Sequence, residues 1–159
     1  MTSVAAWIES TSLSQFIINR SWTWPTLESL HFLGLCVLIG AVLIMDLRLI
    51  GFQREIPLRA VHKLMPFALL GFTVNLLTGV MFVFGEPQLY LDNPAFRIKM
   101  SLIVLAGLNF VLYYYKVDPL LTRLGPDSPP PPLAKGVGAA SLLFWFGVLA
   151  YGRLLPYFG

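Results

Sequence analysis

The side chains best suited to chemistry in this sequence lie near one end of its apolar segments. His31 is roughly 9 Å along the first apolar segment and Lys99 roughly 8 Å along the third, at about 1.5 Å per helical residue. Met81 shares this level, because it lies shortly before the end of the second segment. Ionisable groups surrounded by hydrocarbon are costly and usually have a partner or a function. This layer is therefore the candidate site.

The layer contains an imidazole, thioethers and cations, which are the groups that bind a haem. Imidazole ligates iron, a thioether can be the opposite axial ligand, and Arg or Lys can pair with the two propionates. We therefore predict a b-type haem with His31 as its metal ligand. The predicted cofactor-binding residues are His31, Met81, Arg97, Lys99 and Arg153. Met100 and Tyr151 bracket the same level.

Other interpretations of these residues also fit the sequence. A lone histidine near a helix end can equally make an interhelical hydrogen bond. Glu28 and His31 have the Glu-x-x-His spacing of di-iron bundles, but such a site needs further inward carboxylates, and Asp46 follows only near the opposite surface. His62, beside Lys63 in a basic loop, is expected to face headgroups and water. It cannot share an iron with His31 across most of a ~30 Å hydrocarbon core.

Four apolar segments must position these groups. Of the 159 residues, 57% are hydrophobic and 12% charged, and the mean hydropathy is +0.73. The segments cover residues 25–49, 64–84, 94–115 and 135–155, each long enough for a membrane-spanning helix of ~20 residues. We predict an all-α integral membrane protein in which residues 25–159 form a four-helix bundle. Asn93 and Pro94 are predicted to begin the third helix, as its N-cap and first residue.

Residues 1–24 are predicted to form an interfacial segment outside the bundle. They lack the features of a signal peptide, so we expect them to remain in the mature protein. Their apolar residues are interspersed with Ser, Thr, Glu and Arg, which predicts one or two short amphipathic helices in the outer interface. Aromatic residues are expected to form belts at both surfaces. The belt residues are Trp22, Trp24 and Tyr90 on the outer side and Tyr113, Tyr114 and Tyr115 on the inner side.

Small and polar residues within the segments are interpreted as packing groups. Gly71, Asn75 and Gly79 recur every four residues along one predicted helix face, and such a stripe permits close helix approach. Replacing Gly79 with Leu is therefore expected to separate two helices. The single cysteine, Cys36, is also assigned to packing. Interhelical contacts of the inner half are expected from Asp46, Arg48, Asn109 and Tyr113.

The distribution of Lys and Arg predicts the orientation, because cationic loops resist translocation. The first and third connections hold seven Lys and Arg residues, against four on the opposite side. The third connection also contains a proline-rich stretch over residues 125–132 that is expected to be extended. The seven are Arg48, Arg54, Arg59, Lys63, Lys116, Arg123 and Lys135, and the four are Arg20, Arg97, Lys99 and Arg153. This excess predicts a bacterial inner-membrane protein with both termini in the periplasm.

Five stretches of the sequence resemble a family of uncharacterised bacterial four-helix inner-membrane proteins. They lie at residues 28–34, 46–51, 77–79, 93–99 and 106–109 and span most of the first three predicted helices. More distantly, a histidine in the first helix with a lysine early in a later one is similar to HemJ-type protoporphyrinogen IX oxidases, which are haem-associated, and to CopD-like membrane proteins. The resemblance implies that His31 matches this histidine and Lys99 this lysine. Where related proteins often have a further histidine, at the end of the third span, this chain has three tyrosines, Tyr113 to Tyr115.

Three functions fit the sequence. The first is a membrane b-type haem protein in electron transfer at the periplasmic leaflet, with a quinone or a periplasmic carrier as partner. The second is a non-catalytic subunit or scaffold of a larger membrane complex or homo-oligomer. The third is a small transporter or copper-handling protein with His31, Met81 and Met100 as soft ligands. Membrane lipid surrounds the chain in each case, and its net charge of +3 fits loops against anionic lipid without any nucleic acid.

The charge distribution makes a direct prediction about topology. A reporter fused after Gly159 is expected to be active only in a periplasmic assay, and one inserted at Ser128 only in a cytoplasmic assay. The reverse pattern would place His31 in the opposite leaflet.

Overall fold

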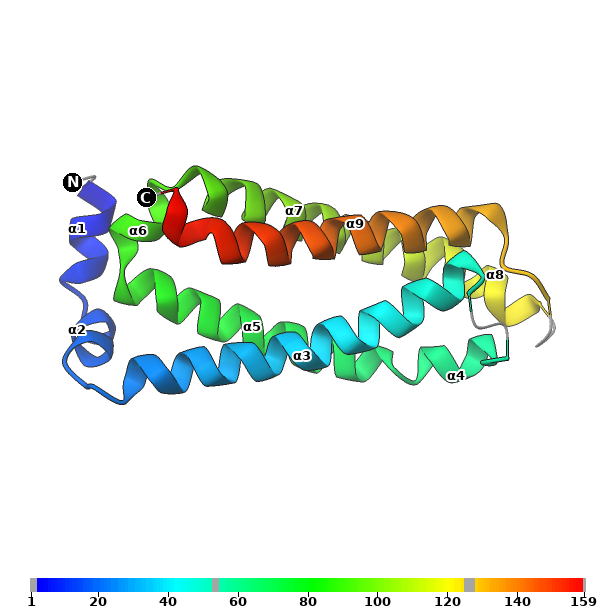
Figure 1. The fold of residues 1–159 in the computed structure, drawn as a ribbon, viewed down its shortest axis with the longest axis horizontal. Helices are drawn as coiled ribbons and strands as arrows, with labels where there is room; N and C mark the ends of the chain where they lie inside the picture. The colour runs from blue at the N-terminus through cyan, green and yellow to red at the C-terminus, as the bar shows by residue number, and fades with distance from the viewer. Residues whose placement is uncertain (1–2, 53–54, 125–127, 159) are drawn as a thin grey trace.

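The protein is a bundle of four long antiparallel helices, seen in a computed structural model that describes residues 3–52, 55–124 and 128–158 (Figure 1). Each of these helices, together with the helical turns that continue it, has the length and apolar composition needed to cross a membrane. The long helices are α3 (Thr23–Ile50), α5 (Met65–Gly85), α7 (Pro94–Leu112) and α9 (Pro132–Leu154). The predicted all-α four-helix membrane fold is thus confirmed.

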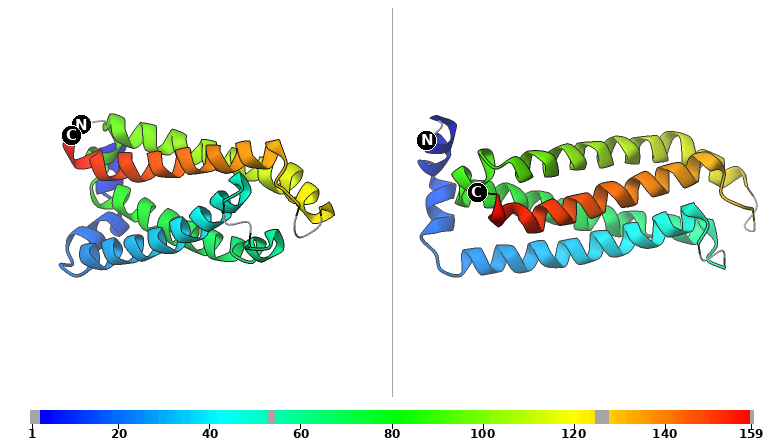
Figure 2. Two further views of the ribbon diagram at one scale, coloured as in Figure 1. Left: turned by 45° about the vertical axis from the view of Figure 1, so that its right-hand side comes forward. Right: turned by 45° about the horizontal axis from the view of Figure 1, so that its top comes forward.

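Short helices close the two ends of the bundle. The end that holds the chain termini carries α1 (Ser3–Glu9), α2 (Ser12–Ile18), α6 (Pro87–Leu91) and the 3₁₀ turn η2 (Leu155–Tyr157) (Figures 1 and 2). The opposite end carries α4 (Leu58–His62), the π-helical turn η1 (Tyr113–Val117) and α8 (Asp118–Arg123). The predicted N-terminal helices therefore form, and α2 packs against α5 while α1 packs against α6.

Asn93 fixes the start of α7, as predicted, and also joins two helices. Its side-chain oxygen accepts a hydrogen bond from the Ala95 amide at 2.9 Å, which satisfies a free N–H of the first turn. Its amide nitrogen donates to the Leu155 carbonyl at 2.9 Å, and the residue is only 2% exposed. One buried side chain thus holds the start of α7 against the end of α9.

The third span continues beyond its predicted end at residue 115. Helical structure runs on through η1 and α8 to Arg123. A proline inside an α-helix clashes with the carbonyl four residues earlier. The wider π-helical turn of η1 immediately before Pro119 changes that spacing and lets the helix continue.

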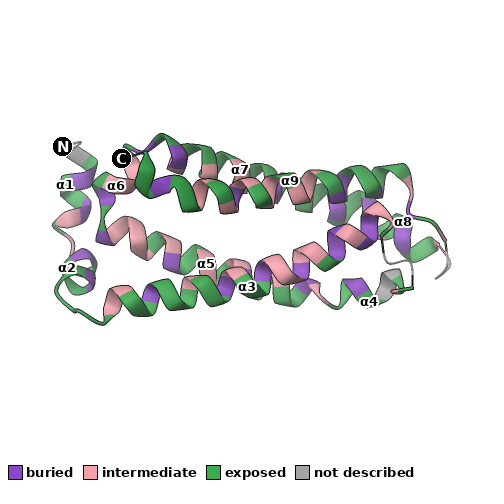
Figure 3. Ribbon diagram, in the orientation of Figure 1, coloured by how far each residue is buried: buried purple, intermediate pink, exposed green. Residues whose placement is uncertain are grey.

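The four long helices pack as an incomplete ring. Helix α3 packs against both α5 and α9, and α9 packs against α7, whereas α5 and α7 hardly approach each other. The hydrophobic core lies toward the end with α4 and α8, where buried residues gather (Figure 3). Its members are Met45, Leu49, Val61, Met65, Tyr113, Val117, Leu121, Ala134 and Val137. The half of the bundle nearer the termini is less filled.

Two glycines allow α3 and α5 to meet closely. A Cβ on Gly71 would lie 2.6 Å from the Leu38 nitrogen and 2.7 Å from the Gly34 carbonyl oxygen. A Cβ on Gly34 would lie 2.5 Å from the side-chain nitrogen of Asn75, which donates to the Gly71 carbonyl at 2.8 Å. These contacts leave no room for a methyl group on either helix.

Gly79 does not take part in this contact. The expectation that Gly79→Leu separates α3 from α5 is therefore wrong. A Cβ there would have no atom within 4 Å. Each step of four residues turns about 40° around a helix of 3.6 residues per turn, so Gly79 points roughly 80° away from Gly71. Cys36, expected to pack between helices, is exposed on the bundle surface.

The proline-rich linker is described only in part. Residues 125–127 lie outside the described residues. Pro131, just before α9, has φ −65° and ψ 157°, which is the polyproline II region that the sequence predicts.

The glycine contact predicts opposite effects for one substitution at two sites. Gly71→Ala should lower the free energy of unfolding by about 1–3 kcal/mol, because the new methyl group meets backbone atoms of α3. Gly79→Ala is the matched control and should be neutral or slightly stabilising, because a helical Ala is favoured over Gly by roughly 0.5–1 kcal/mol. Thermal unfolding in detergent, followed by circular dichroism, measures both. Equal effects of the two substitutions would show that Gly71 is not at a tight contact.

Candidate functional site

A cavity of about 680 Å³ lies between the long helices in the half of the bundle nearer the termini. We call it the terminal cavity. Its polar and aromatic lining comes from all four long helices and from α6. These residues are Trp24, Glu28, His31, Phe32, Phe72, Asn75, Phe82, Tyr90, Phe96, Lys99, Trp145 and Arg153. The remaining lining is mostly aliphatic, so the charged groups stand out within it.

Two consecutive hydrogen bonds favour the tautomer of His31 that carries its proton on Nδ1. The His31 Nδ1 lies 2.7 Å from the Thr78 hydroxyl oxygen. With the Thr78 hydroxyl proton directed at the Val74 carbonyl, 2.7 Å away, the hydroxyl oxygen accepts from Nδ1–H. In that tautomer of the neutral imidazole, Nε2 is the unprotonated nitrogen. It is the atom available to ligate a metal or to accept a proton.

Aromatic rings form a continuous wall beside His31. The Phe82 ring centroid lies 5.2 Å from that of His31 and 5.2 Å from that of Trp24. Tyr90 stacks on Phe82 at 6.5 Å and meets Phe96 edge-on at 5.4 Å. Trp24 and Tyr90, expected only in an interfacial belt, thus line the terminal cavity. This packing holds the imidazole ring in one orientation.

Tyr90 lies in α6, outside the membrane-spanning helices, and supplies a stable hydrogen-bond donor. Burial, and then the nearby carboxylates of Glu86 and Glu28, raise the pKa of Tyr90 to about 12. The phenol therefore remains protonated at neutral pH. Glu28 itself accepts a hydrogen bond from the Trp24 indole at 3.0 Å.

The charge balance of the terminal cavity favours an anion. Lys99 and Arg153 both line it, whereas Glu28 is its only acidic lining residue among those described. The Lys99 side chain runs along α9, because its Nζ would lie 3.5 Å from a Cβ placed on Gly152. Neither cation forms a salt bridge within the described part of the chain. Two cations against one carboxylate leave charge to be matched by a ligand.

The structure brings together three of the five sequence-predicted site residues. His31, Lys99 and Arg153 line the terminal cavity, and Met81 and Arg97 do not. Arg97 is exposed and donates to the Leu91 carbonyl at 3.4 Å. The thioether that lines the cavity is that of Met100.

Thr78 is the site residue that sequence reasoning missed as a partner of His31. It lies on the same helix as the small-residue stripe of Gly71, Asn75 and Gly79. Its pairing with His31 depends on the antiparallel register of α3 on α5, and no spacing within one helix reveals that register. The glycine contact between Gly34 and Gly71 sets it.

The other histidine lies at the far end of the bundle. His62 Nδ1 is 3.0 Å from the Asp118 carboxylate, and the His62 side chain is 49% exposed. This pair joins α4 to α8 in a solvent-accessible position, as expected for an interfacial residue. The described residues contain no group of three or more His, Cys, Asp or Glu side chains that can hold a metal ion. A di-iron or similar carboxylate site is therefore not present among them.

Comparison with known proteins yields a family but no activity. A family model described as a family of unknown function, DUF6644, matches residues 6–158. No curated protein and no solved structure matches the sequence. The matched region includes every residue that lines the terminal cavity. Function must therefore be argued from the site.

The relay through Thr78 can be tested with two identical substitutions on one helix. Thr78→Val should lower the free energy of unfolding by about 1–3 kcal/mol, because it leaves the partly buried Nδ1–H without its acceptor. Nitrogen-15 NMR should then show loss of the single Nδ1–H tautomer. Thr73→Val is the control: Thr73 makes the same kind of bond to its own helix, at 2.8 Å to Leu69, but is exposed. If both variants keep the tautomer, Thr78 does not orient His31.

Proposed function

This chain belongs to DUF6644, a family of unknown function, and we propose that it is a membrane b-type haem protein that transfers electrons at the periplasmic leaflet. The state of His31 is the observation that carries the proposal. Its Nδ1 is committed to Thr78, so Nε2 is left as the ligand nitrogen of a side chain that lines a large cavity. Histidines that bind metals usually donate their other ring N–H in this way.

The remaining lining fits the other requirements of haem. The propionates need cations, and Lys99 and Arg153 line the cavity with no salt-bridge partner among the described residues. The porphyrin ring needs apolar walls, which Phe82 and Phe96 provide. The volume of about 680 Å³ lies within the range of roughly 300–1,000 Å³ that is typical of pockets for ligands of this class.

Met100 would be the second residue to hold the haem iron. Its side chain lines the terminal cavity, whereas that of Met81 does not. A histidine and a methionine together hold the iron in some haem proteins. We therefore transfer to Met100 the role that the sequence suggested for Met81.

Two observations favour this function over its alternatives. A purely structural subunit fills its interior, whereas this one has a large cavity lined by Lys99 and Arg153, which form no salt bridge among the described residues. A copper site built from His31, Met81 and Met100 is disfavoured, because Met81 lies outside the cavity that the other two line.

Bound haem supplies one-electron transfer. The residues of this chain would bind it, orient it and set its environment. Phe82 and Tyr90 lie between His31 and the end of the bundle, where a periplasmic carrier would approach. A quinone dissolved in the bilayer would approach from the side, where α5 and α7 hardly meet.

The proposal predicts that the two histidines behave differently. His31→Ala should abolish the Soret band, because the strongest bond to the cofactor is lost, whereas His62→Ala should retain it. Added imidazole should restore the band to His31→Ala, which separates a missing ligand from a misfolded protein. Lys99→Ala should weaken haem retention or shift the reduction potential without removing the band. Absorption spectra and redox titrations of the purified variants measure these effects.

An unchanged Soret band in His31→Ala would contradict the assignment of the ligand. A band that depends on His62 instead would move the haem to the opposite end of the bundle. If loss of the band is not rescued by imidazole and gel filtration shows an aggregated variant, His31 has only a structural role.

A further inference from the structure

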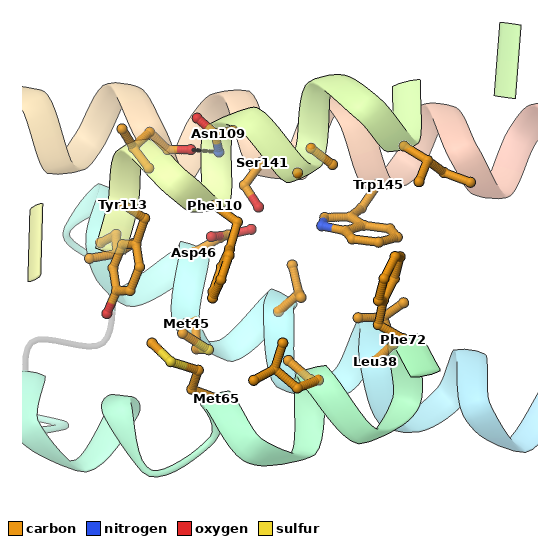
Figure 4. Close-up of a pocket in the computed structure, with 18 residues that line it drawn as sticks. Leu38, Met45, Asp46, Met65, Phe72, Asn109, Phe110, Tyr113, Ser141 and Trp145 are labelled. Carbon is orange, nitrogen blue, oxygen red and sulfur yellow. Dashed lines mark hydrogen bonds between the residues drawn. The ribbon is translucent and has the colours of Figure 1, made fainter. Parts of the chain in front are cut away.

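A second cavity lies deeper in the bundle, around the buried side chain of Asp46 (Figure 4). We call it the Asp46 cavity. Its volume is about 170 Å³. It adjoins the terminal cavity, because Leu38, Phe72, Ile103 and Trp145 line both. Haem binding as proposed above uses only the terminal cavity, so the Asp46 cavity needs its own explanation.

Asp46 lacks a full set of partners. The residue is only 5% exposed, and the Ser141 side chain points toward its carboxyl (Figure 4). The second carboxyl oxygen, Oδ2, has no hydrogen-bond partner in the parts of the chain that the structure describes. A buried carboxyl among apolar side chains is costly unless a donor or a cation satisfies it. This atom therefore calls for a hydrogen-bond donor inside the cavity.

Among the described residues, no neighbouring group supplies that donor. The Asn109 amide nitrogen donates to the Val137 carbonyl at 3.0 Å, so it serves the contact between α7 and α9 (Figure 4). A metal ion would need several oxygen ligands, and no group of three His, Cys, Asp or Glu side chains is found among the described residues. A ligand that donates one hydroxyl to Oδ2 is the simpler match.

The walls of the Asp46 cavity suit an aromatic ring. They include the rings of Phe72, Phe110 and Trp145 and the thioether of Met45. Phe72 and Trp145 meet edge-on at 6.3 Å. Dry cavities of about 150 Å³ in other proteins hold one benzene ring, so 170 Å³ is enough for a single ring but not for a haem.

An apolar tail on such a ring has an exit into the bilayer. The cavity is lined by α5 through Leu69 and by α7 through Gly107 and Phe110, and these two helices hardly approach each other. A molecule from the hydrocarbon phase can therefore enter between them without crossing water.

We propose that the Asp46 cavity binds the hydroxylated ring of a membrane quinol, with the hydroxyl donating to Asp46 Oδ2 and the isoprenoid tail leaving between α5 and α7. This site is distinct from the terminal cavity and does not depend on haem. Ser141 assists by holding the carboxyl in place.

The test uses 4-heptylphenol, a single-ring mimic of a quinol that carries one hydroxyl donor, and 4-heptylanisole, its O-methylated form, which lacks the donor. Calorimetric titration of the full-length protein in detergent measures the affinity for each. The parent protein should bind the hydroxyl form about tenfold or more tightly than the methylated one, because a carboxylate hydrogen bond is lost. In Asp46→Leu, that preference should disappear.

Two further variants locate the ligand. Ala106 is buried and lines the Asp46 cavity, so Ala106→Leu should fill the space and weaken binding of both forms. Gly79→Leu is the matched control, because Gly79 lines only the terminal cavity and has open space around it, and it should leave both affinities unchanged. Circular dichroism and gel filtration establish that each variant is folded.

The proposal is overturned if the parent protein binds neither form, or if Asp46→Leu keeps the preference for the hydroxyl form. It is also overturned if Gly79→Leu loses binding while Ala106→Leu retains it, since the ligand then occupies the terminal cavity. A colourless parent protein that still shows the Asp46-dependent preference would refute the haem proposal alone.

Discussion

The close approach of α3 and α5 at Gly34 and Gly71 is the constraint on which the rest of the structure depends. Backbone atoms of the two helices meet where neither carries a side chain, and this fixes their register. The register brings His31 on α3 to Thr78 on α5 and thereby favours one imidazole tautomer. Because α3 also packs against α9, the fourth side of the ring between α5 and α7 is left nearly without contact. Residues of both α5 and α7 line each of the two cavities.

The fold was largely predictable because a membrane imposes few and strong rules. Helix length and apolar composition defined the four spans, and a capping residue followed by proline located the start of α7 at Asn93. The helix contact was predicted only in part. A repeat of four residues suggested Gly79, but helical rotation turns it toward the terminal cavity, and Gly34 on another helix completes the contact instead. A pattern within one helix cannot reveal which residue of a second helix it meets.

The sequence predicted the level of the candidate site along the helices better than it predicted which residues line the site. Counting residues from the helix ends placed His31 and Lys99 at one level, and both line the same cavity. Depth does not determine the direction in which a side chain points, so Met81 and Arg97 were included although they lie outside the lining, while the aromatic wall of Trp24, Phe82 and Tyr90 was missed. Asp46 was interpreted as a packing group, and only the packed structure reveals that one of its oxygens lacks a partner among the described residues.

The central claim is that His31 presents its Nε2 to a haem in the terminal cavity. The most direct test is the absorption spectrum of the full-length protein, purified in detergent from cells well supplied with haem and recorded in the oxidised and reduced states. The account predicts a Soret band that shifts on reduction, with about one haem per chain, as expected for a single histidine ligand at this level. A colourless protein under these conditions would contradict it.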